Sequence, residues 1–189
     1  MTSRRFSISR TFASLAIWGC FVTTSAFAQP WSIPALPSGA HVLDGLLGGW
    51  TYVERGKGFT ATGTWTFSRS ADGFVIYDQF RTPNGKGGTA IVVDTFRAFN
   101  PTTQTWNFQA VTYQAREIGA RSGEWDSGTT VARDGQIVDE IRKGNMISRV
   151  RFYDITNERF QCSVATSADA GKTWGKTIRI EAVRSRTER

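Results

Sequence analysis

Strict alternation of residue types is the feature that most constrains how this chain folds. Residues 59–67 read F-T-A-T-G-T-W-T-F, so threonine occupies every second position. Successive side chains of a β-strand point to opposite faces, which places Phe59, Gly63, Trp65 and Phe67 together and the threonines opposite them. This segment therefore predicts a strand with one buried face and one exposed face.

Similar segments, rich in Thr, Val, Ile and aromatic residues, fill most of the chain. Turn signals such as Asp72-Gly73 and Asp126-Ser127-Gly128 separate them. We predict about ten strands, with rough spans at 50–55, 58–69, 74–82, 89–99, 104–115, 117–125, 129–133, 136–143, 147–155, 159–167 and 174–184. Sheets with so many strands usually close, because closure removes exposed edges. The predicted fold is all-β, a closed or nearly closed antiparallel up-and-down barrel with one short N-terminal helix at 41–47; a β-sandwich is the alternative.

The N-terminus predicts export. Residues 1–28 contain three arginines, an apolar run too short to span a bilayer, and Ala26-Phe27-Ala28. This order is typical of a cleaved signal peptide, with cleavage near Ala28 and a periplasmic or secreted product. A lipid anchor at Cys20 is the weaker alternative, because the bulky Trp18 fits a lipobox poorly. We further predict an extended arm at 29–40, a lipocalin-like barrel domain at 41–184 and a basic tail at 185–189.

Composition excludes several functions for the remaining 161 residues, which suffice for one domain. Loss of three arginines lowers the formal charge from +7 to +4, and much of the remainder lies in the C-terminal tail. We therefore predict no nucleic-acid partner and no membrane span. The one histidine, His41, and the single remaining cysteine, Cys162, are too few for a typical zinc or haem site, so we predict no metal and no cofactor.

Residues 167–174 read S-A-D-A-G-K-T-W, the Asp-box pattern known from sialidase propellers. The pattern occurs once, whereas a propeller needs several repeats, so a sialidase is excluded. The serine and aspartate side chains can accept hydrogen bonds from nearby backbone N–H groups, and Gly171 can adopt a positive φ. We predict a turn that joins the last two strands, with Trp174 packed on the core.

Several motifs occur in an order that resembles a known family. Gly48-Gly49-Trp50 resembles the G-x-W signature of lipocalins, which implies that an arginine near the end, Arg184 or else Arg179, packs over Trp50. The order of motifs over residues 43–184 is similar to the lipocalin-like, DUF1579-type family of exported bacterial proteins, which has no settled activity. The motifs are T-W-T-F at 64–67, D-G at 72–73, Y-D-Q-F-R at 77–81, F-R-A-F-N-P at 96–101, R-V-R-F-Y-D-I-T at 149–156 and the Asp-box. Cys162 and Ile178 depart from the family's usual aromatic residues.

Charged and aromatic residues within the strands are the candidate ligand-binding groups. Arg97, Arg149 and Arg151 lie in apolar strands, where an arginine inside a barrel must be paired. Such an arginine would pair with Asp78 or Asp94, or would hold the carboxylate of a bound acid. If the strands have the opposite register, the arginines point outward and are solvated. Trp65 and Trp106 are the aromatic residues that we expect to stack on a ligand.

Three functions follow from these residues. The first is an exported barrel that binds a small apolar or amphipathic molecule, including an acid. The second is a cofactor-independent isomerase, cyclase or lyase, with Asp78 and Glu140 as acid/base groups and Tyr77 as a proton donor. The third is an assembly protein that docks on a second copy through its arm. A one-residue slip exchanges the two faces of a strand, so register decides which residues line the interior.

Overall fold

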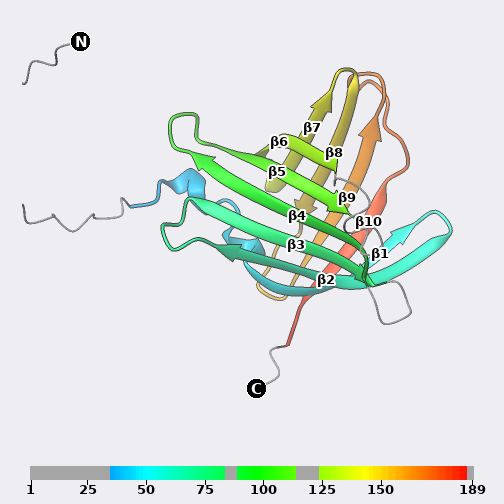
Figure 1. The fold of residues 1–189 in the computed structure, drawn as a ribbon, viewed down its shortest axis with the longest axis horizontal. Helices are drawn as coiled ribbons and strands as arrows, with labels where there is room; N and C mark the ends of the chain where they lie inside the picture. The colour runs from blue at the N-terminus through cyan, green and yellow to red at the C-terminus, as the bar shows by residue number, and fades with distance from the viewer. Residues whose placement is uncertain (1–34, 84–88, 114–123, 187–189) are drawn as a thin grey trace, which may run out of the picture. The chain divides into compact units, whose positions relative to one another are not determined.

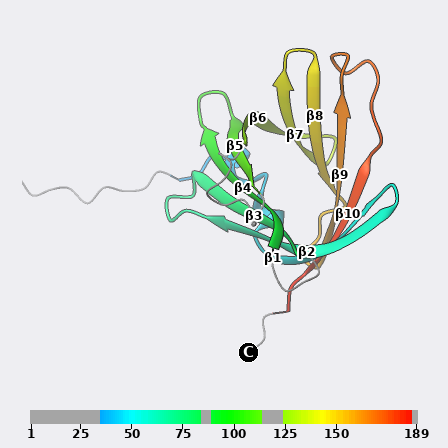
Figure 2. The same cartoon turned by 45° about the vertical axis from the view of Figure 1, so that its right-hand side comes forward.

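Ten antiparallel strands close into a barrel in which sequence neighbours pair and β1 pairs with β10, as Figures 1 and 2 show. The computed structural model describes residues 35–83, 89–113 and 124–186. The predicted signal peptide, the first half of the predicted arm (29–34) and the last three residues lie outside these ranges. The strands are β1 (Gly48–Gly56), β2 (Phe59–Arg69), β3 (Val75–Pro83), β4 (Thr89–Asn100), β5 (Thr105–Tyr113), β6 (Glu124–Arg133), β7 (Gln136–Lys143), β8 (Met146–Tyr153), β9 (Arg159–Ser167) and β10 (Ile178–Arg184). The predicted fold class is confirmed.

The alternation in β2 gives the barrel its inside and outside. Gly63, Trp65 and Phe67 are buried, whereas the threonines between them are exposed. Trp65 lies within 6 Å, centroid to centroid, of the rings of Phe67, Phe80, Phe152 and Phe160. Such edge-to-face and offset contacts favour the burial of aromatic rings. Phe59 departs from the prediction, because it lies at the strand end and is 47% exposed.

Two 3₁₀ helices, η1 (Ser38–His41) and η2 (Asp44–Leu46), replace the single predicted helix at 41–47. Leu43 and Leu46 are buried in the same cluster as the barrel core. The indole N–H of Trp50 donates to the carbonyl of Leu46 at 2.7 Å. The segment is thus fixed to the barrel core by both apolar packing and a buried hydrogen bond.

The resemblance to lipocalins correctly predicts a contact between the first and the last strand of the barrel. Trp50 pairs with Arg184 across β1 and β10. The Arg184 guanidinium lies 4.1 Å from the Trp50 ring centroid, and its Nη1 donates to the Leu47 carbonyl at 2.9 Å. A cation over an indole face in a partly buried site favours closure beyond the strand hydrogen bonds.

The predicted turn at Asp126-Ser127-Gly128 is wrong, because these residues lie inside β6. They pair with Ala110, Gln109 and Phe108 of β5. A Cβ on Gly128 would lie 2.3 Å from the Glu140 carbonyl oxygen and 2.5 Å from the Phe108 ring. The glycine therefore marks a close approach within a sheet rather than a turn.

The Asp-box forms the predicted turn between β9 and β10. Ser167 Oγ accepts from the backbone N–H of Gly171 at 2.8 Å, and Asp169 accepts from the backbone N–H and the hydroxyl of Thr173 at 2.8 and 2.6 Å. Trp174, however, does not enter the core as predicted. Its ring centroid lies 4.2 Å from the Arg149 guanidinium, on the outer face of β8, because β10 begins only at Ile178.

Candidate functional site

A cavity of about 210 Å³ lies inside the barrel. Its wall is mostly apolar and aromatic, and most of its polar side chains are charged. The lining residues are Trp65, Asp78, Phe80, Val93, Thr95, Arg97, Phe108, Ala110, Thr112, Asp126, Asp139, Ile141, Val150, Phe152, Val164 and Ile180. A concave apolar site with a few convergent polar groups is typical of small-molecule binding.

A buried ion-pair cluster forms the polar part of this cavity wall. Arg97 Nη1 donates to Asp78 at 2.6 Å, and Arg97 Nη2 donates to Asp139 at 2.6 Å. All three side chains are at most 6% exposed. Trp65 donates to the other oxygen of Asp78 at 2.9 Å, and Thr130 donates to that of Asp139 at 2.6 Å. Each carboxylate oxygen therefore has a donor, as buried charges require.

Burial and the ion pairs act in opposite directions on the pKa values of the cluster, and the outcome differs between Asp78 and Arg97. It raises the pKa of Asp78 to about 6, although the Arg97 charge and the Trp65 hydrogen bond oppose the shift. For Arg97, burial acts to lower the pKa, but the two carboxylates outweigh it and the pKa is raised. Arg97 therefore keeps its positive charge, while Asp78 changes its charge near pH 6.

One donor of the cluster is unused. Within the described residues, Arg97 Nε has no hydrogen-bond partner although it is fully buried. The Arg97 guanidinium lies 5.4 Å from the Phe108 ring centroid, and both side chains line the cavity. A buried N–H without an acceptor destabilises the folded protein. A bound ligand with an acceptor atom at this point would supply the missing hydrogen bond.

The structure brings three of the predicted site residues into this cavity, namely Trp65, Arg97 and Asp78. Trp106 is buried elsewhere: its indole N–H donates to the Gly39 carbonyl at 3.2 Å, and its ring packs against Phe99. It does not line the cavity.

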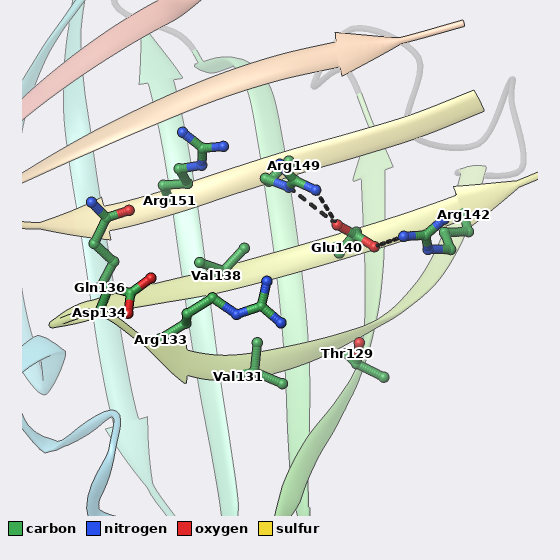
Figure 3. A pocket seen from close by; sticks show the side chains of 10 residues that line it. All are labelled: Thr129, Val131, Arg133, Asp134, Gln136, Val138, Glu140, Arg142, Arg149 and Arg151. Carbon is green, nitrogen blue, oxygen red and sulfur yellow. Dashed lines mark hydrogen bonds and ion pairs between the residues drawn. The ribbon is translucent and has the colours of Figure 1, made fainter. Parts of the chain in front are cut away.

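The other four predicted residues lie on the outer face. The Tyr77 hydroxyl donates to Asp94 at 2.8 Å, and burial together with that carboxylate raises its pKa to about 12. Adjacent strand residues point to opposite faces, so Tyr77 cannot share the cavity with Asp78. Glu140, Arg149 and Arg151 line a separate, open hollow of about 470 Å³ over β6, β7 and β8, shown in Figure 3.

Glu140 is held by two arginines in that outer hollow. Arg149 donates to it twice, at 3.1 and 2.7 Å, and Arg142 forms an ion pair with it at 2.6 Å (Figure 3). Partial burial acts to raise the pKa of Glu140, but these hydrogen bonds and charges lower it overall. A carboxylate held as an anion by two arginines is poorly suited to act as a general acid.

Asp139 lines the cavity but is not among the residues predicted from the sequence. It alternates with Ile137 and Ile141, the same pattern that pointed to Asp78 between Ile76 and Phe80. The local signal was therefore present. Its pairing with Arg97 across 42 residues of sequence depends on strand register, which local patterns do not define.

Comparison with known proteins supports the fold. No protein-family model and no curated protein matches the sequence. The crystal structure of Rv2717c from M. tuberculosis is similar, with 13% identity, a TM-score of 0.50, and coverage of 80% of this chain and 99% of that one. The S-type phycobiliprotein lyase CPES from Guillardia theta has 9% identity, a TM-score of 0.50, and coverage of 77% and 92%. These neighbours are lipocalin-like barrels, and at such identities they establish the fold alone.

No three His, Cys, Asp or Glu side chains of the described residues are grouped as metal ligands would be. No helix within the same residues has the length and hydropathy needed to cross a bilayer.

Proposed function

We propose that this protein is an exported carrier that binds one small, largely apolar and neutral molecule inside its barrel. The unused, fully buried N–H of Arg97 beside an aromatic cavity is the observation that carries this proposal. The lipocalin-like fold of its structural neighbours is consistent with ligand binding. Export rests on the predicted signal peptide, and the N-terminal residue of the secreted or periplasmic protein, measured by mass spectrometry, would test it.

The volume limits the size of the ligand. Pockets for drug-sized molecules measure about 300–1,000 Å³, whereas this cavity measures about 210 Å³. The cavity therefore suits a compact molecule, such as one with a single ring.

Charge limits the type of ligand. Both terminal nitrogens of Arg97 already donate to Asp78 and Asp139, so the two-pronged grip expected for a bound acid is occupied. A ligand carboxylate would add a third negative charge beside one buried positive charge. We therefore favour a neutral ligand with a carbonyl, ether or hydroxyl oxygen that accepts from Arg97 Nε.

Three single-ring probes test this proposal. Acetophenone has a carbonyl acceptor, ethylbenzene has none and benzoate is charged. We expect acetophenone to quench tryptophan fluorescence and raise the Tm most, because it alone offers a neutral acceptor. Ala110→Phe should abolish binding because Ala110 lines the cavity, whereas Gln109→Phe, on the exposed face of the same strand, should not. Equal responses of the two variants, or no response to any probe, would refute the proposal.

A second candidate function is supported by Asp78. A buried carboxylate with a pKa near 6 in a cavity fits a general acid or base, as an isomerase, cyclase or lyase would need. The similar barrel from Guillardia theta is named a lyase, so an enzyme can have this fold. Mass spectra of a co-purifying molecule, compared between the wild-type protein and Asp78→Asn, would separate a substrate that is converted from a ligand that is only bound.

A further inference from the structure

We propose a second binding site, for a phosphate- or sulfate-type oxyanion, on the outer face of β8, β9 and β10. Arg149, Arg151, Ser163 and Trp174 line it, and Arg179 is the register partner of Ser163 on β10. This site is separated from the interior cavity by the sheet, because Val150 and Phe152 of the same strand line the cavity on the opposite face.

Strand register builds the site. Arg151 of β8 pairs with Ser163 of β9, and Ser163 pairs with Arg179 of β10. Neighbouring strands lie about 4.8 Å apart, so the two arginines flank a single small residue at roughly 10 Å between backbones. In the adjacent row, Arg149 pairs with Ala165. Small residues on β9 thus leave open space between long cationic side chains.

The resulting hollow has a volume of about 270 Å³. Ser163 and Ala165 form its floor, and Arg149, Arg151, Trp174 and Thr177 form its walls. Arg149 is fixed in place by the Trp174 ring at 4.2 Å and by Glu140 at 2.7 and 3.1 Å. One wall is therefore preorganised, which reduces the entropy lost when a ligand binds.

The positive charge in and beside this hollow is not balanced by the protein. Glu140 offsets Arg149, but no carboxylate within the described residues pairs with Arg151 or Arg179. The next arginine of the row, Arg55, is already paired with Glu181 at 2.8 Å. Two free guanidinium groups beside a hydroxyl suit a tetrahedral oxyanion, because each planar fork can donate two parallel hydrogen bonds.

Isothermal titration calorimetry of the full-length protein with inorganic phosphate at low salt tests the proposal. We expect saturable binding that Arg151→Gln weakens about tenfold or more, since one of two free guanidinium groups is lost. Ser163→Leu should have a similar effect by filling the floor. Arg159→Gln is the matched control: it removes the same charge from the same face of β9, roughly 13 Å from Ser163. It should change affinity less than twofold.

A second arm distinguishes a free oxyanion from a lipid headgroup. Co-sedimentation is measured with vesicles of phosphatidylcholine alone and with added phosphatidylglycerol, for the wild-type protein, Arg151→Gln and Arg159→Gln. Binding to the anionic vesicles that only Arg151→Gln impairs supports the site and identifies a headgroup as its ligand. Phosphate binding without vesicle binding supports it and identifies a free oxyanion. Equal losses in Arg151→Gln and Arg159→Gln, or no saturable binding in either arm, would overturn the proposal.

Discussion

Replacement of Asp78 by asparagine should flatten the pH dependence of the free energy of unfolding. Asp78 is fully buried, and its pKa is raised from 3.8 to about 6, mainly by burial. The native state therefore binds a proton more tightly than the unfolded state. The stabilisation that this proton gives is complete below about pH 4 and is lost as the pH rises through 6.

The size of the effect follows from the shift. A shift of roughly two pKa units corresponds to about 3 kcal/mol in total. Of this, about 1.4 kcal/mol falls between pH 8 and pH 5, where the shift is only partly expressed. The wild-type protein should gain that amount over this interval relative to Asp78→Asn, which cannot take up the proton.

Urea unfolding at pH 5, 6, 7 and 8, followed by tryptophan fluorescence, measures this difference. Phe152→Leu is the control, because it keeps every charge and removes only packing at a fully buried position. It should lower stability by about 1 kcal/mol at each pH and leave the curve parallel to that of the wild-type protein. Parallel curves for the wild-type protein and Asp78→Asn would show that Asp78 does not take up a proton in this range, and the reasoning would fail.

Three further substitutions test the packing. Arg97→Leu leaves two buried carboxylates without their cation and should cost about 3–5 kcal/mol, measured by urea unfolding at pH 7; a loss under about 1 kcal/mol would mean that the cluster is solvated. Gly128→Ala places a methyl group 2.3 Å from the Glu140 carbonyl oxygen and should lower stability by about 1–3 kcal/mol, and an unchanged Tm would contradict the close approach of β6 and β7. Gly171→Val at φ +89° should cost about 1–3 kcal/mol in thermal unfolding while ligand affinity in the cavity is unchanged; a loss of affinity without a loss of Tm would make the Asp-box part of the site.

Local patterns predicted the barrel because strand alternation and turn type depend on residues that are close together in the sequence. The alternation at 59–67 and the Asp-box at 167–174 needed no distant partner to be interpreted. The Asp126-Ser127-Gly128 turn was wrong for the opposite reason. Its composition favours a turn. In the structure Gly128 packs against Phe108, twenty residues away in the sequence, and the strand continues through it.

The site was harder to predict because it depends on which face of each strand points inward. Arg149 and Arg151 share a face with Ile147, which suggested an interior face. Ile147 is indeed buried, yet on the outside of β8, where a Cβ on Gly171 of the Asp-box turn would lie 3.5 Å from it. Arg97 and Asp78 were recognised as a candidate pair, whereas Asp139 required the complete register of the barrel.

The contact between Trp50 and Arg184 also has a consequence for synthesis. The first strand obtains its second partner only when Ile178–Arg184 has been made, because β1 pairs with β10. Until then, the growing chain exposes the hydrogen-bonding edges of β1 and of the most recent strand, which can pair with other chains. Ribosome-bound chains that lack the last strand should therefore be the species most prone to aggregate, and most dependent on a chaperone.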